Sequence, residues 1–131
     1  NNFMIKFLKK YHNIDTGLLL LRLGLAAVFI MHGWSKIQNL GATGSFFSSI
    51  GLNMFWVYVV AYVEFLGGIA MLIGLFSRWA GFLLAIDMLF AIYLVRWPRG
   101  FLGGYEFELL LLLAALAIHL AGPGKYSISK R

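Results

Sequence analysis

Four long apolar stretches constrain this chain more than any other feature of its sequence. They cover about residues 17–37, 55–76, 79–95 and 105–121. Each is close to the ~20 apolar residues that a helix needs to cross the hydrocarbon core of a bilayer. Short segments that contain Gly, Pro, Ser or Arg separate the stretches, and such residues interrupt helices. The sequence therefore predicts an all-α integral membrane protein, built as a four-helix transmembrane bundle in a single domain.

The composition agrees with lipid as the solvent. Hydrophobic residues make up 61% of the 131 residues and charged residues only 12%, against about 25% charged residues in a soluble domain. A soluble fold of this size has too little interior to bury so much apolar surface. The bilayer is therefore the first expected partner, and nucleic acid is not expected, because the basic residues lie at the ends of apolar stretches.

Two segments lie outside the four spans. Residues 1–12 place apolar and basic side chains on opposite faces of a helix, which predicts an amphipathic helix at the membrane interface; a disordered basic tail is the alternative. The apolar face consists of Phe3, Met4, Phe7, Leu8 and Tyr11, and the basic face of Lys6, Lys9 and Lys10. The Gly- and Ser-rich residues 40–53 predict a loop, with a short interfacial helix at residues 46–50.

The distribution of Lys and Arg predicts the orientation of the bundle. One side has the two chain ends and the turn after the second span, with Lys6, Lys9, Lys10, Arg78, Lys125, Lys130 and Arg131. The other side has only Lys36, Arg96 and Arg99. Because basic residues concentrate on the cytoplasmic side, we expect both termini to be cytoplasmic.

Several ionisable residues lie within the spans, where a charge that faces lipid is costly. Helical phase places them on stripes together with small residues, and such stripes favour close packing between helices. The stripes are Arg22, Phe29, His32, Gly33 and Lys36; Glu64, Gly67, Gly68 and Met71; Ala80, Asp87 and Ala91; and Glu108, Ala115 and His119. The ionisable groups are therefore predicted to face one another inside the bundle.

Depth along the spans, at ~1.5 Å per residue, sorts these groups into two sets. The inner set is Arg22 and Asp87, interpreted as a structural ion pair. The outer set is a cluster of His32, Lys36, Glu64 and either Glu106 or Glu108. An imidazole, a carboxylate and an ammonium in one pocket suit proton exchange or binding of a polar head group, and Phe29 and Met71 are expected to line its apolar part. The alternative is that all these charges only fix the bundle.

Other chemistries fit the sequence poorly. His32 and His119 lie ~19 Å apart along the membrane normal, too far to share a haem. Glu106 and Glu108 point to opposite sides of a helix, which makes them a poor metal pair. The chain has no cysteine, so thiolate metal sites and iron–sulfur clusters are not expected. No self-contained catalytic motif is present.

The order of five short motifs resembles the DoxX family over about residues 17–129. The motifs are Arg22-Leu23-Gly24-Leu25 with His32-Gly33-Trp34-Ser35-Lys36; Glu64-Phe65-Leu66-Gly67-Gly68; Gly74 with Arg78; Gly103-Gly104-Tyr105-Glu106; and Gly122-Pro123-Gly124 followed by Ser127. Family members often end in Ser-x-Asp, whereas this chain has Ser129 at the position of the aspartate.

The resemblance implies a four-helix protein of the bacterial cytoplasmic (inner) membrane. Founding relatives are subunits of a thiosulfate:quinone oxidoreductase, so it also implies a quinone as ligand and a redox subunit or a second copy of the chain as partner. The family pattern points to Arg22, His32, Lys36, Glu64, Arg78 and Glu106. It thus favours Glu106 where helical phase favours Glu108, and we follow the resemblance and expect Glu106 in the cluster, with Glu108 second. The leading hypothesis is a redox-associated subunit that binds a quinone-like molecule. A non-enzymatic scaffold is the second hypothesis, and a small transporter is the third.

Overall fold

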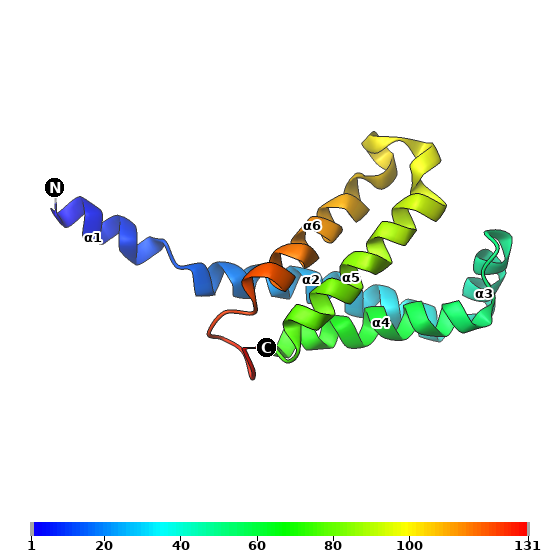
Figure 1. Cartoon of the computed structure of the whole chain (residues 1–131), viewed down its shortest axis with the longest axis horizontal. Coiled ribbons are helices and arrows are strands. Elements are labelled where there is room, and N and C mark those ends of the chain that lie inside the picture. The colour runs from blue at the N-terminus through cyan, green and yellow to red at the C-terminus, as the bar shows by residue number, and fades with distance from the viewer. Residues whose placement is uncertain (1, 131) are drawn as a thin grey trace.

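The computed structural model describes residues 2–130, and over that range it contains helices and no β-strand (Figure 1). Asn1 and Arg131, which belong to the predicted interfacial helix and to the basic C-terminus, lie outside the described residues, as does the side chain of Tyr11. The helices are α1 (Asn2–Tyr11), α2 (Ile14–Gln38), α3 (Leu40–Ser49), α4 (Met54–Ile73), α5 (Ser77–Ala91) and α6 (Glu106–Ala121). Between α5 and α6 the chain forms the short turns η1 (Ile92–Arg96), η2 (Trp97–Arg99) and η3 (Phe101–Tyr105).

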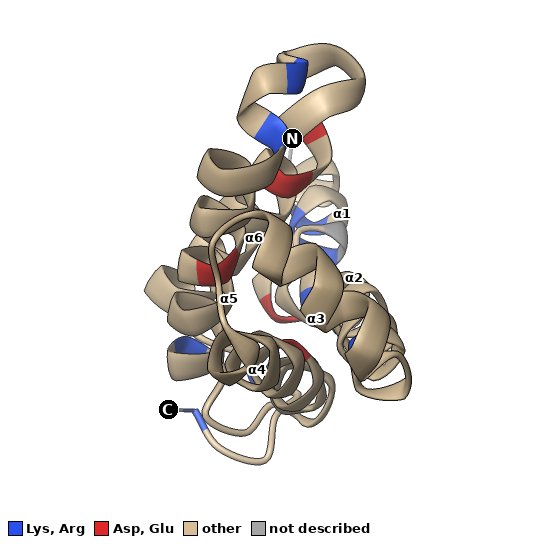
Figure 2. Ribbon diagram, turned by 90° about the vertical axis from the view of Figure 1, so that its right-hand side faces the viewer, with Lys and Arg blue, Asp and Glu red and all other residues tan. Residues whose placement is uncertain are grey.

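Four of the described helical segments are long and apolar enough to cross a membrane, which confirms the predicted fold class. The third segment runs from Ser77 to Arg99, because η1 and η2 continue α5. Large apolar side chains such as Leu66, Leu110 and Leu120 point outward and are more than half exposed. Charged residues are sparse along the ribbon (Figure 2). This surface matches lipid as its surroundings.

The bundle consists of two helix pairs. Helix α2 packs along α4, α5 packs along α6, and the two pairs cross (Figure 1). Gly68 of α4 meets α2 so closely that a β-carbon there would lie 2.8 Å from the backbone nitrogen of Ile30. Gly81 of α5 meets α6 in the same way, with 3.0 Å to the backbone nitrogen of His119. Small residues therefore set the close approach of both pairs, as helical phase predicts.

Helix α3 corrects the prediction of a loop at residues 40–53. The predicted short helix at residues 46–50 covers only its last turns. The side chain of Phe47 is buried, and Gly44 leaves room for the sulfur of Met54. These tertiary contacts outweigh the low helix propensity of the Gly- and Ser-rich segment. The helix ends where Leu52 donates to the carbonyl of Phe47 at 2.9 Å and Gly51 takes φ +86°.

The chain after α6 returns to the end of the bundle that carries the α4–α5 turn. Ile128 and Ser129 donate backbone hydrogen bonds to the carbonyls of Ile73 and Gly74, at 3.2 and 3.0 Å. The backbone nitrogen of Lys125 donates to the Asp15 carboxylate at 2.9 Å. The C-terminal segment thus joins the start of α2 to the end of α4. We call this end of the bundle the α4–α5 end and the opposite end the α3 end.

Candidate ligand pocket

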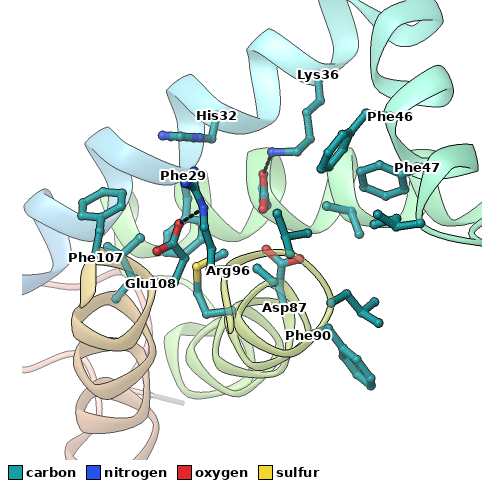
Figure 3. A pocket seen from close by; sticks show the side chains of 18 of the residues that line it. Phe29, His32, Lys36, Phe46, Phe47, Asp87, Phe90, Arg96, Phe107 and Glu108 are labelled. Carbon is teal, nitrogen blue, oxygen red and sulfur yellow. Dashed lines mark hydrogen bonds and ion pairs between the residues drawn. The ribbon is translucent and has the colours of Figure 1, made fainter. Parts of the chain in front are cut away.

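A cavity of about 250 Å³ lies between the two helix pairs, toward the α3 end. Helices α2 to α6 and η1 all contribute to its wall, which is mostly apolar (Figure 3). Six ionisable side chains interrupt that wall: His32, Lys36, Glu64, Asp87, Arg96 and Glu108. The structure therefore gathers ionisable residues from all four spans, including the η1 extension of α5, around a single space.

The shortest contact in the pocket joins Lys36 of α2 to Glu64 of α4. The Lys36 Nζ lies 2.6 Å from the Glu64 Oε1. Glu64 is 3% exposed, whereas the Lys36 side chain reaches it from a more open position, 23% exposed. A charge-assisted hydrogen bond of this length in an apolar setting fixes the two helices against each other. The predicted meeting of Lys36 and Glu64 is correct.

Asp87 of α5 also faces this pair, so the predicted Arg22–Asp87 ion pair is wrong. Asp87 lines the same cavity as Lys36 and Glu64, close enough to interact electrostatically with both. The error came from the helix ends. Helix α4 ends at Ile73 and α5 begins at Ser77, so Glu64 and Asp87 lie nine and ten residues from the α4–α5 turn. At ~1.5 Å per residue they are level, whereas boundaries at residues 76 and 79 had separated them.

Arg22 instead completes the α4–α5 end of the bundle. It is 1% exposed, and its guanidinium donates to the carbonyls of Met71 and Leu72 at 2.9 and 3.3 Å. The same group donates to the carbonyls of Pro123 and Tyr126, at 2.9 and 2.7 Å. Five N–H donors in a planar fork suit this task. Arg22 therefore joins the last turn of α4 to the C-terminal segment.

Arg78 provides hydrogen-bond donors for the last carbonyls of α6. Its guanidinium donates to the carbonyls of His119, Leu120 and Ala121 at 3.1 to 3.5 Å. The ring Nδ1 of His119 in turn lies 2.9 Å from the carbonyl oxygen of Arg78. A helix leaves its last four carbonyls without a partner in the helix, and these contacts supply partners. Two arginines singled out by the family pattern thus cap helix ends and lie outside the pocket.

The second ion pair of the pocket was not predicted. The Nε of Arg96 lies 3.0 Å from the Oε1 of Glu108 at the start of α6. Sequence reasoning placed Arg96 in a loop outside the membrane, because Pro98 and Gly100 follow it. Residues 92–96 instead form a π-helical turn, which changes the direction of the side chain relative to an α-helix. The only available signal was the presence of arginines at the end of the third span and of glutamates at the facing start of the fourth.

Glu108, and not Glu106, faces the pocket, so the preference for Glu106 that followed the family pattern is wrong and the helical phase, which favoured Glu108, is right. Glu108 is 8% exposed and lines the cavity. Glu106 is exposed, and its Oε1 accepts a hydrogen bond of 3.1 Å from the backbone nitrogen of Gly103. Gly103 has φ +70°, in the region that favours glycine. Glu106 therefore stabilises the turn before α6.

Of the other residues predicted to line the site, Phe29 and His32 do so and Met71 does not. Phe29 is 1% exposed and lines the cavity. His32 also lines it, but is exposed at its edge, where its ring lies 6.5 Å from that of Phe107. Met71 is fully buried in the core beside Arg22 and does not line the cavity, so its predicted role there is wrong. Phe46 and Phe47 of α3 close the wall instead, and the loop prediction had hidden them (Figure 3).

Two carboxylate oxygens at the pocket lack a hydrogen-bond partner. They are the Oδ2 of Asp87 and the Oε2 of Glu108, both fully shielded from solvent. The lining residues carry three carboxyl groups against the two cations Lys36 and Arg96. Such a pocket can hold a polar head group and give up or accept protons.

Comparison with known proteins places these features in a family. A model of the DoxX family matches residues 17–97. The chain is 40% identical over 110 residues to "Putative oxidoreductase CatD" of Bacillus subtilis, covering 84% of this chain and 82% of that protein. It is 30% identical over 121 residues to "Inner membrane protein YqjF" of Escherichia coli, covering 88% and 92%. No solved structure matches the chain.

Proposed function

Because this chain belongs to the DoxX family, we propose that it is a redox-associated inner-membrane protein that binds a quinone-like molecule. The head group of that molecule would occupy the cavity between the helix pairs. The names of the relatives, one a putative oxidoreductase and one an inner-membrane protein, support the redox association and the location in the inner membrane. The ionisable residues of the pocket support the binding of a polar head group.

The observation that carries the proposal is the presence of two ion pairs and a further carboxyl group, that of Asp87, in one apolar-walled cavity. Charges within a membrane are expensive and tend to mark functional sites. Pockets for drug-sized ligands measure ~300–1,000 Å³, so a cavity of about 250 Å³ fits a ring-sized head group and leaves a longer tail outside. The exposed apolar surface around the bundle would accommodate such a tail in lipid.

The pocket residues have distinct roles in this proposal. Lys36 and Glu64 hold the head group and set its orientation through their short hydrogen bond. Asp87 adds a third ionisable group beside them and provides a place for a proton that leaves or joins the ligand. Phe29 packs against the ring, and His32 at the edge of the cavity passes protons toward the outside.

Lipid extraction from the purified protein tests this proposal. Wild type should carry a quinone-like molecule that mass spectrometry detects, and Glu64→Gln should retain less of it at equal folded fraction. Glu106→Gln is the matched control, because Glu106 is exposed and lies outside the cavity. Wild type without such a ligand, even after incubation with a short-chain quinone, would contradict the proposal.

A scaffold without ligand is the alternative that the geometry also favours. The ion pairs join different helices, Lys36–Glu64 across α2 and α4 and Arg96–Glu108 across η1 and α6. If they only fix the bundle, Glu64→Gln should lower stability, and no small molecule should copurify with wild type.

We also propose that both termini face the cytoplasm and that α1 lies at the membrane surface. Helix α1 projects away from the bundle (Figure 1), and Phe3, Met4, Phe7 and Leu8 are all exposed. The three lysines of the same helix, Lys6, Lys9 and Lys10, are exposed as well. An apolar stripe beside three ammonium groups suits an anionic lipid surface.

A further inference from the structure

The unsatisfied polar atoms of the pocket are all of one kind. Within residues 2–130, three buried side-chain oxygens lack a hydrogen-bond partner, and two of them, the Asp87 Oδ2 and the Glu108 Oε2, belong to the pocket. Both belong to carboxyl groups. The third is the hydroxyl of Ser77, which does not line the cavity. A buried polar atom without a partner costs free energy, so a ligand that satisfies it gains affinity.

The hydrogen-bond donors of the pocket, in contrast, already have partners. The Lys36 Nζ already binds Glu64 at 2.6 Å, and the Arg96 Nε already binds Glu108 at 3.0 Å. Their side chains are 23% and 36% exposed, so these donors are less enclosed than the two carboxyl oxygens. A ligand carbonyl would add a second partner to a donor that is already bound and would gain little. A ligand hydroxyl would reach acceptors that have no partner at all.

We infer that the pocket binds the reduced, dihydroxy form of a quinone-like molecule more tightly than the oxidised, dicarbonyl form. The inference rests on the proposed function and adds which form of the ligand is preferred. A hydroxyl of the diol donates to the Oε2 of Glu108 or to the Oδ2 of Asp87. The diol and the dicarbonyl are both neutral, so the preference arises from this hydrogen bond and not from charge.

Glu108 is the better residue for a test. It is 8% exposed, and its Oε1 stays bound to Arg96 while its Oε2 faces no protein donor. Glu108→Gln keeps the shape of the side chain and replaces one acceptor oxygen with an N–H donor. The change should therefore weaken binding of the diol and leave binding of the dicarbonyl equal or improved.

Binding of a short-chain benzoquinone and of its dithionite-reduced diol to the purified full-length protein, under anaerobic conditions, tests the inference. Wild type should bind the diol about three- to tenfold more tightly, the value of one hydrogen bond in this setting. Glu108→Gln should reduce that ratio toward one, and Glu106→Gln should leave it unchanged.

The possible outcomes separate the two proposals. Equal binding of both forms, or tighter binding of the dicarbonyl, would overturn the inference but keep the proposed function; the second result would mean that a protonated carboxyl donates to the ligand. Binding of neither form would overturn both. A ratio that Glu106→Gln changes as much as Glu108→Gln would show that the preference arises outside the pocket.

Discussion

Replacement of Arg22 by Met tests how the α4–α5 end of the bundle is held together. The last four carbonyls of α4 all have partners: the backbone nitrogen of Gly74 serves Ala70, Arg22 serves Met71 and Leu72, and Ile128 serves Ile73. Within a membrane such groups have no water to bind. Arg22→Met keeps the apolar stem of the side chain but removes every donor.

The structure gives the size of the expected loss. Four hydrogen bonds of 2.7 to 3.3 Å disappear. Side-chain hydrogen bonds in membrane proteins average ~0.6 kcal/mol, and those of charged donors in soluble proteins reach ~1.5–3 kcal/mol. Four bonds at the first value give about 2 kcal/mol and at the lower end of the second about 6 kcal/mol, so the free energy of unfolding should fall by about 2–6 kcal/mol.

Reversible unfolding in mixed micelles, followed by circular dichroism during an SDS titration, measures this loss. Arg78→Met is the matched control, because Arg78 also caps a helix end but is exposed, and its carbonyl partners can turn to water. We expect that control to lose less than about 1 kcal/mol. Equal losses for the two variants would refute the argument from burial. Asp87→Leu should add independently to Arg22→Met, because the two residues do not meet.

Three further predictions follow from the packing and the charges. Gly33→Ala should lower stability, because a β-carbon there would collide with the backbone of Phe65. Gly24→Ala on the same helix is the control: its β-carbon would meet nothing within 4 Å, so it should stabilise the protein by up to ~1 kcal/mol. Thermal unfolding in detergent compares the two variants. A peptide of residues 2–12 should bind anionic vesicles and lose that binding in high salt or after Lys→Gln changes at its three lysines, whereas equal binding to neutral vesicles would count against the charge argument. Cysteines introduced at residues 2 and 130 should resist an impermeant thiol reagent applied to the periplasmic side of intact cells, and labelling at either position would reverse the orientation.

The spans and their contacting faces were predictable because lipid imposes long apolar segments and small residues where helices meet. The Lys36–Glu64 contact followed from the same periodicity. Asp87 was assigned to the wrong level because the end of α4 and the start of α5 were placed three and two residues too late, which made Glu64 too far from the turn and Asp87 too close to it. In a bundle, each residue of error moves a side chain by ~1.5 Å along the axis, which is enough to choose the wrong partner.

Other features of the pocket could not be predicted from local sequence. The π-helical turn that brings Arg96 to Glu108 has no sequence signature, and α3 packs against the neighbouring helices α4 and α2, with Phe47 buried. The error at Glu106 has a different cause, because it came from the family pattern and not from helix boundaries. The family pattern selected Glu106, and the structure shows that it stabilises a turn through the backbone of Gly103. A recurring residue can therefore be structural.

Photoaffinity labelling with an azido-quinone tests most directly whether the cavity is the ligand site. After irradiation of the protein in lipid and peptide mapping, the label should be found within residues 28–36, 87–96 or 107–111, which line the cavity. An excess of unlabelled quinone should prevent the reaction. Label confined to the apolar groove between α4 and α5, around Tyr62 and Trp79, or spread evenly over the lipid-facing surface, would contradict a head-group site between the helix pairs.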